Sequence, residues 1–281
     1  MESSRAPLVL LVLAARAAHA LSSTRIMNVA IPKLPSGREL ELCEGLQDAA
    51  DGESMESLDE LFSVGGTLWP CAAALCRWMN DNSEKQVQGK RILELGGGTG
   101  ACGLYAAAMG AARVVLTDST PRLIRLMENN CERNERAGNL PGLATSSLDL
   151  SFEQFTWNSE PPPSGPWDLI IGSDCTYEFD EDAHADLAAT LSALLPRSGA
   201  SSAPKVVLAH QHRNRAAGAQ VQRWDDQDEP LQRFLDALGR QQLGASQLVW
   251  ERPEEGGSGN ELVPMEGEDE ISIIEVVRRA E

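Results

Sequence analysis

A glycine-rich segment between two apolar stretches most narrows the folds open to this chain. Residues 91–95 are short and apolar, residues 96–100 read Gly-Gly-Gly-Thr-Gly, and an alanine-rich stretch continues to about residue 109. Glycines permit a tight turn and let a ligand approach the backbone without a Cβ collision, and the helix that follows offers unpaired N–H groups. The segment therefore predicts a strand, a ligand-binding turn and a helix.

Two acidic residues accompany this turn. Glu94 lies in the predicted first strand, and Asp118 ends the second, eighteen positions after Gly100. A carboxylate at the second position can bind ribose hydroxyls, so the pair predicts a site for an adenosine-containing ligand at the carboxyl ends of the strands. The spacing of Gly98, Gly100 and Gly103 also matches the dinucleotide pattern of NAD-dependent oxidoreductases. Glu94 favours a ligand with a cationic amino-acid tail, such as S-adenosylmethionine, over a diphosphate.

The rest of the chain continues the alternation of strands and helices. This alternation predicts an α/β fold with a doubly wound, Rossmann-like, mostly parallel seven-stranded sheet. The last two strands have no helix between them and are expected to form an antiparallel C-terminal edge pair. The predicted strands are 91–95, 114–117, 145–150, 167–173, 205–210, 246–251 and 271–277, and the predicted helices are 67–79, 101–109, 121–136, 182–195 and 231–238.

Composition divides the chain and bounds its partners. Residues 1–25 resemble a targeting leader, 26–64 form an N-terminal extension, and 65–281 form the α/β domain that carries the predicted ligand site. With 42 acidic and 24 basic residues the net charge is −18, which disfavours duplex nucleic acid and favours a basic protein substrate. No segment is expected to span a membrane. The expected location is cytoplasmic, unless residues 1–20 direct the chain to an organelle or the secretory pathway.

Metal and thiol chemistry are not expected. The six cysteines show no zinc-type spacing, and we interpret them as buried free thiols, with Cys175 a small packing residue. His210 and His212 could contribute to a metal site, but no third ligand is evident in the sequence, so a polar strand end is the preferred interpretation.

Three segments together resemble a known family. Residues 94–103 and Asp118 are similar to the cofactor-binding motifs of the seven-β-strand S-adenosylmethionine-dependent methyltransferases. Gly66-Thr67-Leu68-Trp69-Pro70 and residues 168–177 resemble the protein-lysine methyltransferases of methyltransferase family 16, whose D-x-x-Y motif appears here as Asp174 to Tyr177. The resemblance implies a monomeric enzyme that methylates a lysine side chain of another protein.

The resemblance also implies roles for single residues. It places Asp118 at the ribose, Ser173 beside the cofactor, and Asp149 or Leu150 near the adenine, where relatives often have a tryptophan. The remaining residues expected to contact the cofactor are Trp69, Glu94, Gly96, Gly98, Thr99 and Gly100. Asp174 would orient the attacking amine and Tyr177 would form an aromatic wall that contacts the cation. From the spacing alone, Asp174 could equally cap a helix and Tyr177 could be a core residue.

Other functions stay open at this point. A methyltransferase could act on a small molecule or an RNA base instead. A NAD-dependent oxidoreductase and a non-catalytic cofactor-binding protein are further alternatives. The sequence identifies neither the substrate protein nor the lysine.

Overall fold

The computed structural model describes residues 31–44, 64–177, 181–196, 203–212, 228–248 and 271–279. The predicted leader lies outside these residues, as does the acidic, glycine-rich segment before the last strand. None of the helices in the described part of the chain has the length and apolarity that a membrane span requires.

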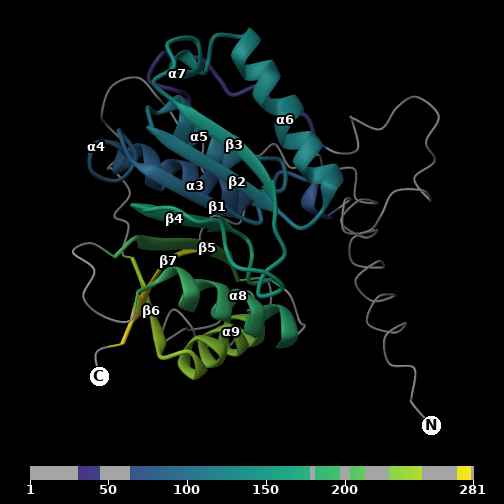
Figure 1. The fold of residues 1–281 in the computed structure, drawn as a ribbon, viewed down its shortest axis with the longest axis vertical. Helices are drawn as coiled ribbons and strands as arrows, with labels where there is room; N and C mark the ends of the chain where they lie inside the picture. Colours follow the sequence, from purple (N-terminus) through teal and green to yellow (C-terminus); the bar gives the residue numbers. More distant parts are fainter. Residues whose placement is uncertain are drawn as a thin grey trace, which may run out of the picture.

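One seven-stranded sheet forms the centre of the molecule (Figure 1). The strand order is β3-β2-β1-β4-β5-β7-β6. Strands β3, β2, β1, β4 and β5 run parallel, and β7 pairs antiparallel with both β5 and β6. The predicted fold class is thus confirmed, with β7 lying between β5 and the edge strand β6. The strands are β1 Arg91–Leu95, β2 Arg113–Asp118, β3 Asp149–Gln154, β4 Leu169–Ser173, β5 Lys205–Gln211, β6 Leu243–Gln247 and β7 Ile271–Arg278.

Helices cover both faces of the sheet. Helices α3, α5, α6 and α7 contribute to the core on one face, whereas α8 and α9 pack together on the other. The strands supply both cores because alternate side chains point to opposite faces: Ile92 belongs to the first core and Leu93 to the second. The helices are α3 Pro70–Asp81, α4 Ser83–Gln86, α5 Ala101–Ala108, α6 Pro121–Arg136, α7 Pro141–Ala144, α8 Glu181–Leu194 and α9 Glu229–Arg240.

The third strand was predicted in the wrong place. The structure has the short helix α7 at Pro141–Ala144 and begins β3 only at Asp149. Leu148 lies within the predicted strand, but in the structure it is a buried apolar residue that precedes β3. Strand β3 therefore ends at Gln154, four residues later than predicted, and Gln154 pairs with Asp118 at the end of β2. The sixth strand also begins earlier than predicted, at Leu243.

An extended segment before the sheet is held against α6 by asparagine side chains. Asn130 Oδ1 accepts the Cys43 N–H at 2.7 Å, and Asn134 Oδ1 accepts the Glu41 N–H at 3.0 Å. Both side-chain amides donate back to carbonyls of the same segment, as a neighbouring strand would. Asn130 Nδ2 also donates to the Thr99 carbonyl at 2.9 Å. The segment 31–44 is therefore tied to the glycine turn through α6.

Candidate functional site

The turn after β1 depends on glycine at several positions. Gly96, Gly98 and Gly100 have φ angles of +62°, +55° and +78°, which is left-handed backbone that side chains disfavour. At Gly98 space is also short, because a Cβ would lie 2.5 Å from the carbonyl oxygen of Gly65. The segment that leads into α3 therefore crosses directly over the turn. The glycine turn and the segment before α3 are therefore packed against each other.

Glu94 lies beneath the turn. Its side chain is buried, and Oε2 accepts the Gly103 N–H near the start of α5 at 2.9 Å. Burial raises the pKa of this carboxyl to about 8; the Gly103 N–H opposes the rise and the nearby Asp118 adds to it. A carboxyl in this state can ionise when a cation binds beside it.

Asp118 joins the end of β2 to the turn. Its Oδ2 accepts the Gly98 N–H at 3.1 Å, and its Oδ1 accepts the Thr120 N–H at 3.2 Å. Burial raises its pKa, whereas the backbone N–H donors counteract the rise. The carboxylate is thus fixed at the carboxyl ends of the strands, as predicted for a group that binds ribose hydroxyls.

Trp69 and Thr99 line the same region. Trp69 is half-buried, directly precedes α3, and donates its indole N–H to the Val64 carbonyl at 3.0 Å. Thr99 is buried within the turn. Both residues therefore lie near the turn that the sequence assigned to the cofactor.

The D-x-x-Y segment begins directly after β4, the neighbour of β1. Leu95 pairs with Gly172, and the Cys175 thiol donates to the Leu95 carbonyl at 3.3 Å. The strand order reverses between β1 and β4, and ligands of doubly wound sheets bind at such a point. Ser173 and Asp174 therefore lie beside the glycine turn.

The structure removes two alternatives for the D-x-x-Y residues. Asp174 does not cap a helix, because α8 begins only at Glu181. Asp174 instead has a left-handed φ of +58°, which is uncommon for a residue other than glycine and is often found at functional sites. Tyr177 is partly exposed, so it is not a core aromatic residue.

Cys175 is a packing residue. Burial raises the pKa of its thiol, and the neighbouring carboxylates raise it further. Its sulfur lies 3.0 Å from the Cβ position of Gly96. A thiol held protonated and enclosed in this way does not act as a nucleophile.

Asp149 and Leu150 do not lie at the cofactor end of the sheet, contrary to the prediction. They begin β3 and pair with Arg113 and Val114 at the start of β2. Because a strand rises about 3.3 Å per residue, they lie roughly 13–16 Å from the strand ends where Asp118 is found. Asp149 is exposed and forms an ion pair with the half-buried Arg113, 3.2 Å between Oδ2 and Nε.

Trp157, unlike Asp149 and Leu150, lies against the glycine turn. It follows β3 by three residues, and its ring carbon Cζ2 lies 3.3 Å from the Cβ position of Gly96. The next residue, Asn158, is fixed to α8, because its N–H donates to Thr190 Oγ1 at 3.0 Å. The two aromatic residues at 155 and 157 were the signal in the sequence, which the misplaced third strand concealed.

A comparison with models of protein families shows the family of this chain. A family model described as lysine methyltransferase matches residues 53–225. The chain belongs to the lysine methyltransferase family. The match spans the glycine turn, Asp118 and the D-x-x-Y segment.

Curated relatives carry the names of protein methyltransferases. Calmodulin-lysine N-methyltransferase of Arabidopsis thaliana is 30% identical, over 61% of this chain and 53% of that protein. The human electron transfer flavoprotein beta subunit lysine methyltransferase is 33% identical, over 40% and 37%. The human histone-arginine methyltransferase METTL23 is 30% identical, over 56% and 77%. The chain spans about half the length of the first of these relatives.

The cofactor that this family uses is S-adenosylmethionine, and the residues present fit it. A buried carboxyl with a raised pKa, Glu94, lies under the turn that would hold a cationic methionine tail. Asp118 lies at the strand end expected for ribose hydroxyls. An aromatic ring, Trp157, lies against the same turn.

Proposed function

We propose that this chain transfers a methyl group from S-adenosylmethionine to the side-chain amine of a lysine in a basic protein. The observation that carries the proposal is the junction of β1 and β4. There the cofactor turn and the D-x-x-Y segment meet, joined by the hydrogen bond from Cys175 to the Leu95 carbonyl. A donor and an acceptor bound on the two sides of this junction would be adjacent.

Methyl transfer requires mainly that the protein hold the attacking amine in line with the methyl group. S-adenosylmethionine supplies a methyl group that its sulfonium already activates. In the transfer the N–C bond forms, the C–S bond breaks, and the amine loses a proton. Lysine has an ordinary pKa of about 10.4, and desolvation lowers it. We assign Asp174 to orienting the amine and passing its proton to water, and Tyr177 to contacting the cation through its ring.

The cofactor pocket follows from the same geometry. We propose that Gly96, Gly98, Thr99 and Gly100 surround the methionine and ribose part, with Asp118 on the ribose hydroxyls. Glu94 would compensate the cationic tail from beneath the turn. Trp69 and Ser173 would pack beside the cofactor, and Trp157 replaces Asp149 and Leu150 as the expected adenine contact.

Arginine is a second candidate for the methyl acceptor. One relative that this chain covers over 77% of its length carries the name of a histone-arginine methyltransferase. A guanidinium is planar and holds its charge, so it would need a flatter site with a second carboxylate. The D-x-x-Y segment with its single acid favours lysine.

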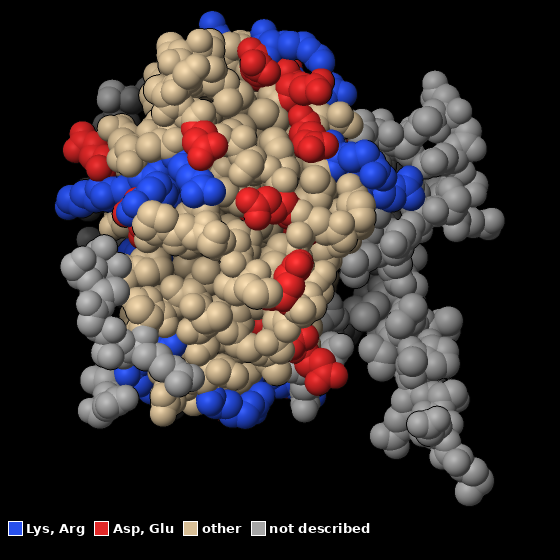
Figure 2. All heavy atoms as spheres, in the orientation of Figure 1, with Lys and Arg blue, Asp and Glu red and all other residues tan. Residues whose placement is uncertain are grey.

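We further propose that the protein acts as a cytoplasmic monomer that does not bind duplex nucleic acid. Figure 2 shows acidic side chains along the right half of the visible face, with basic side chains mainly at its margins. With a net charge of −18, a basic substrate would be attracted and a phosphate backbone repelled. Light scattering after gel filtration tests the monomer, and a fluorescent fusion with and without residues 1–20 tests the location.

Calorimetry tests which cofactor the protein binds. Mass spectrometry tests which residue of the substrate is methylated. We expect the purified full chain to bind S-adenosylmethionine and S-adenosylhomocysteine, and NAD at least about 100-fold more weakly. Incubation with labelled cofactor and cell extract should label a protein band in which mass spectrometry finds a methylated lysine. A preference for NAD would refute the methyltransferase assignment, and methylated arginine would establish the second candidate.

A further inference from the structure

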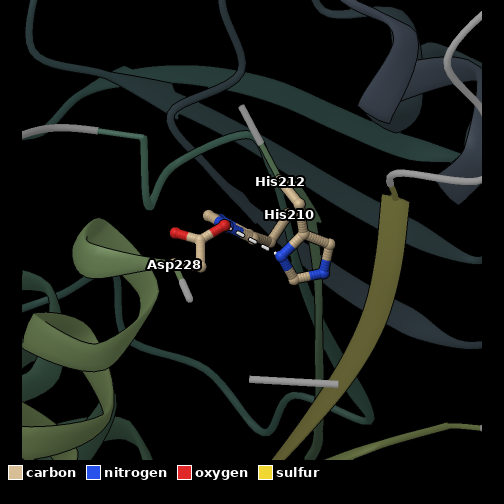
Figure 3. A group of neighbouring side chains, drawn as sticks. All are labelled: His210, His212 and Asp228. Carbon is tan, nitrogen blue, oxygen red and sulfur yellow. Dashed lines mark hydrogen bonds and ion pairs between the residues drawn. The ribbon is translucent and has the colours of Figure 1, made fainter. Parts of the chain in front are cut away.

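Three buried side chains form a cluster behind the end of β4. His210 and His212 are two residues apart at the end of β5, so they share one side of the strand. Both rings face the carboxyl group of Asp228, which precedes α9 (Figure 3). Asp228 Oδ2 lies 3.0 Å from His210 Nε2 and 2.8 Å from His212 Nδ1, and all three residues are about 1% exposed. The proposed reaction uses none of them.

The cluster continues to a hydroxyl group on each side. His210 Nδ1 lies 2.7 Å from Thr176 Oγ1, and His212 Nε2 lies 2.7 Å from Ser272 Oγ on β7. Asp228 Oδ1 accepts the Leu231 N–H at 3.1 Å and so caps α9. One hydrogen-bonded chain therefore connects the D-x-x-Y segment, β5, the start of α9 and β7.

The hydrogen-bond partners of His210 and His212 indicate which ring nitrogens carry protons. An ionised carboxylate only accepts hydrogen bonds, so each ring donates the N–H that faces Asp228. Each hydroxyl then donates to the other ring nitrogen. Burial alone would raise the pKa of Asp228, but the hydrogen bonds from His210 and His212 outweigh burial and lower it. For neutral rings, these partners make His210 the Nε2–H tautomer and His212 the Nδ1–H tautomer.

The same three residues could instead bind a metal ion. The nearest nitrogen of each ring and the Asp228 oxygen lie within 4.8 Å of one another. Oδ2 already lies at N–H···O distance from both rings, and a metal would have to replace both protons. The second nitrogen of each ring has a hydroxyl partner. Every ring nitrogen is satisfied without an ion, so the geometry favours a hydrogen-bonded chain.

We propose that Thr176 is a positioning residue, which His210 and Asp228 hold so that the D-x-x-Y segment keeps its conformation. This inference rests on the proposed function of that segment. Thr176 is fully buried between Asp174 and Tyr177. The main chain of the segment is bonded to β5, because the Asp174 N–H donates to the Ala209 carbonyl at 2.9 Å.

The Thr176 hydroxyl supplies a further attachment of this segment to β5, through His210. Asp174 needs such restraint because its left-handed backbone is unfavourable unless the surroundings impose it. Through this attachment the start of α9 and the end of β5 set the position of Tyr177.

Substitutions at Thr176 and Ser272 separate positioning from stability. Thr176→Val removes the hydroxyl at nearly constant volume, and we expect kcat to fall about 10-fold or more while the cofactor Kd changes less than about 2-fold. Thr176→Ser keeps the hydroxyl and should recover kcat to within about 3-fold of the wild type. Ser272→Ala removes the hydroxyl at the other end of the chain, away from the D-x-x-Y segment, and should leave kcat within about 2-fold.

Two spectroscopic measurements test the inference without an activity assay. The sequence has four histidines, so ¹⁵N-imidazole spectra of the full chain can be assigned, and we expect opposite tautomers for His210 and His212. It has two tyrosines, so fluorotyrosine labelling gives separate ¹⁹F signals for Tyr105 and Tyr177. Thr176→Val should shift or broaden the Tyr177 signal and leave that of Tyr105 unchanged.

The outcomes distinguish this inference from the proposed function. If the wild type transfers no methyl group but the tautomers and the Tyr177 response are as expected, the proposed function fails and the positioning contact stands. An unchanged Tyr177 signal and an unchanged kcat in Thr176→Val would overturn the positioning role. Stoichiometric Zn²⁺ in the purified protein, with both rings metal-bound in the ¹⁵N spectra, would show that the cluster is a metal site instead.

Discussion

The carbonyl oxygen of Gly65 lies 2.5 Å from the point where a β-carbon on Gly98 would be placed. Two segments more than thirty residues apart in the sequence are therefore packed backbone against backbone at the cofactor turn. The contact joins the segment before α3 to the glycine turn.

Gly98→Ala should weaken cofactor binding. The substitution forces a side chain into left-handed backbone, at about 1–3 kcal/mol, and pushes the Gly65 segment away from the turn. We expect the Kd for S-adenosylmethionine to rise more than about 10-fold, measured by calorimetry.

Gly89→Ala is the matched control for this substitution. Gly89 also has a left-handed φ, +69°, but nothing lies within 4 Å of its Cβ position. It should lose stability through backbone strain alone and keep its cofactor affinity. Equal loss of affinity in both variants would show that strain, and not the contact with Gly65, governs the turn.

Glu94 should make stability depend on pH. Its pKa is about 8 in the folded protein, against an ordinary value of 4.5. Between these values the folded state keeps a proton that the unfolded state releases. The stabilisation is therefore fully present below about pH 4.5 and is lost as the pH rises through 8, with a slope that approaches about 1.4 kcal/mol per pH unit.

Glu94→Gln isolates this effect. Glutamine can still accept the Gly103 N–H but cannot ionise. We expect the variant to become progressively more stable relative to the wild type as the pH rises from 5 towards 8, measured by urea unfolding in the absence of cofactor. A difference in the free energy of unfolding that stays constant with pH would contradict the raised pKa.

Asp174→Asn should separate chemistry from cofactor binding. Asparagine tolerates left-handed backbone nearly as well as aspartate, so the substitution removes the charge and spares the conformation. We expect kcat to fall about 100-fold or more with a cofactor Kd within about 3-fold of the wild type. Parallel loss of both quantities would mean that Asp174 holds the cofactor and does not act on the amine.

Trp157→Ala should weaken cofactor binding, whereas Asp149→Asn should not. Stacking of a base on an aromatic ring contributes about 1–3 kcal/mol, so we expect the Kd for S-adenosylhomocysteine to rise about 10- to 100-fold in Trp157→Ala. Asp149 lies at the other end of β3, in an ion pair with Arg113. If Asp149→Asn had the larger effect, the adenine would lie near the start of β3, contrary to the geometry.

The sequence alone determined the elements whose signals are local. Residues 91–95 and 121–136 form the predicted strand and helix with the predicted bounds. In the first case a short apolar run ends at glycines, and in the second a proline begins an amphipathic helix. The turn and its two acids could be identified for the same reason, since glycine spacing and strand ends depend on neighbouring residues.

Only the tertiary structure decided what depends on pairing between distant segments. The place of β3 follows from its register with β2, which puts Trp157 and not Leu150 at the cofactor end. A shift in strand bounds moves a residue along the sheet by several ångströms for each position, and no local pattern records it. Asp228 meets His210 only because the capped start of α9 packs behind β5. A hydrogen bond across such a distance in sequence is a property of the folded chain.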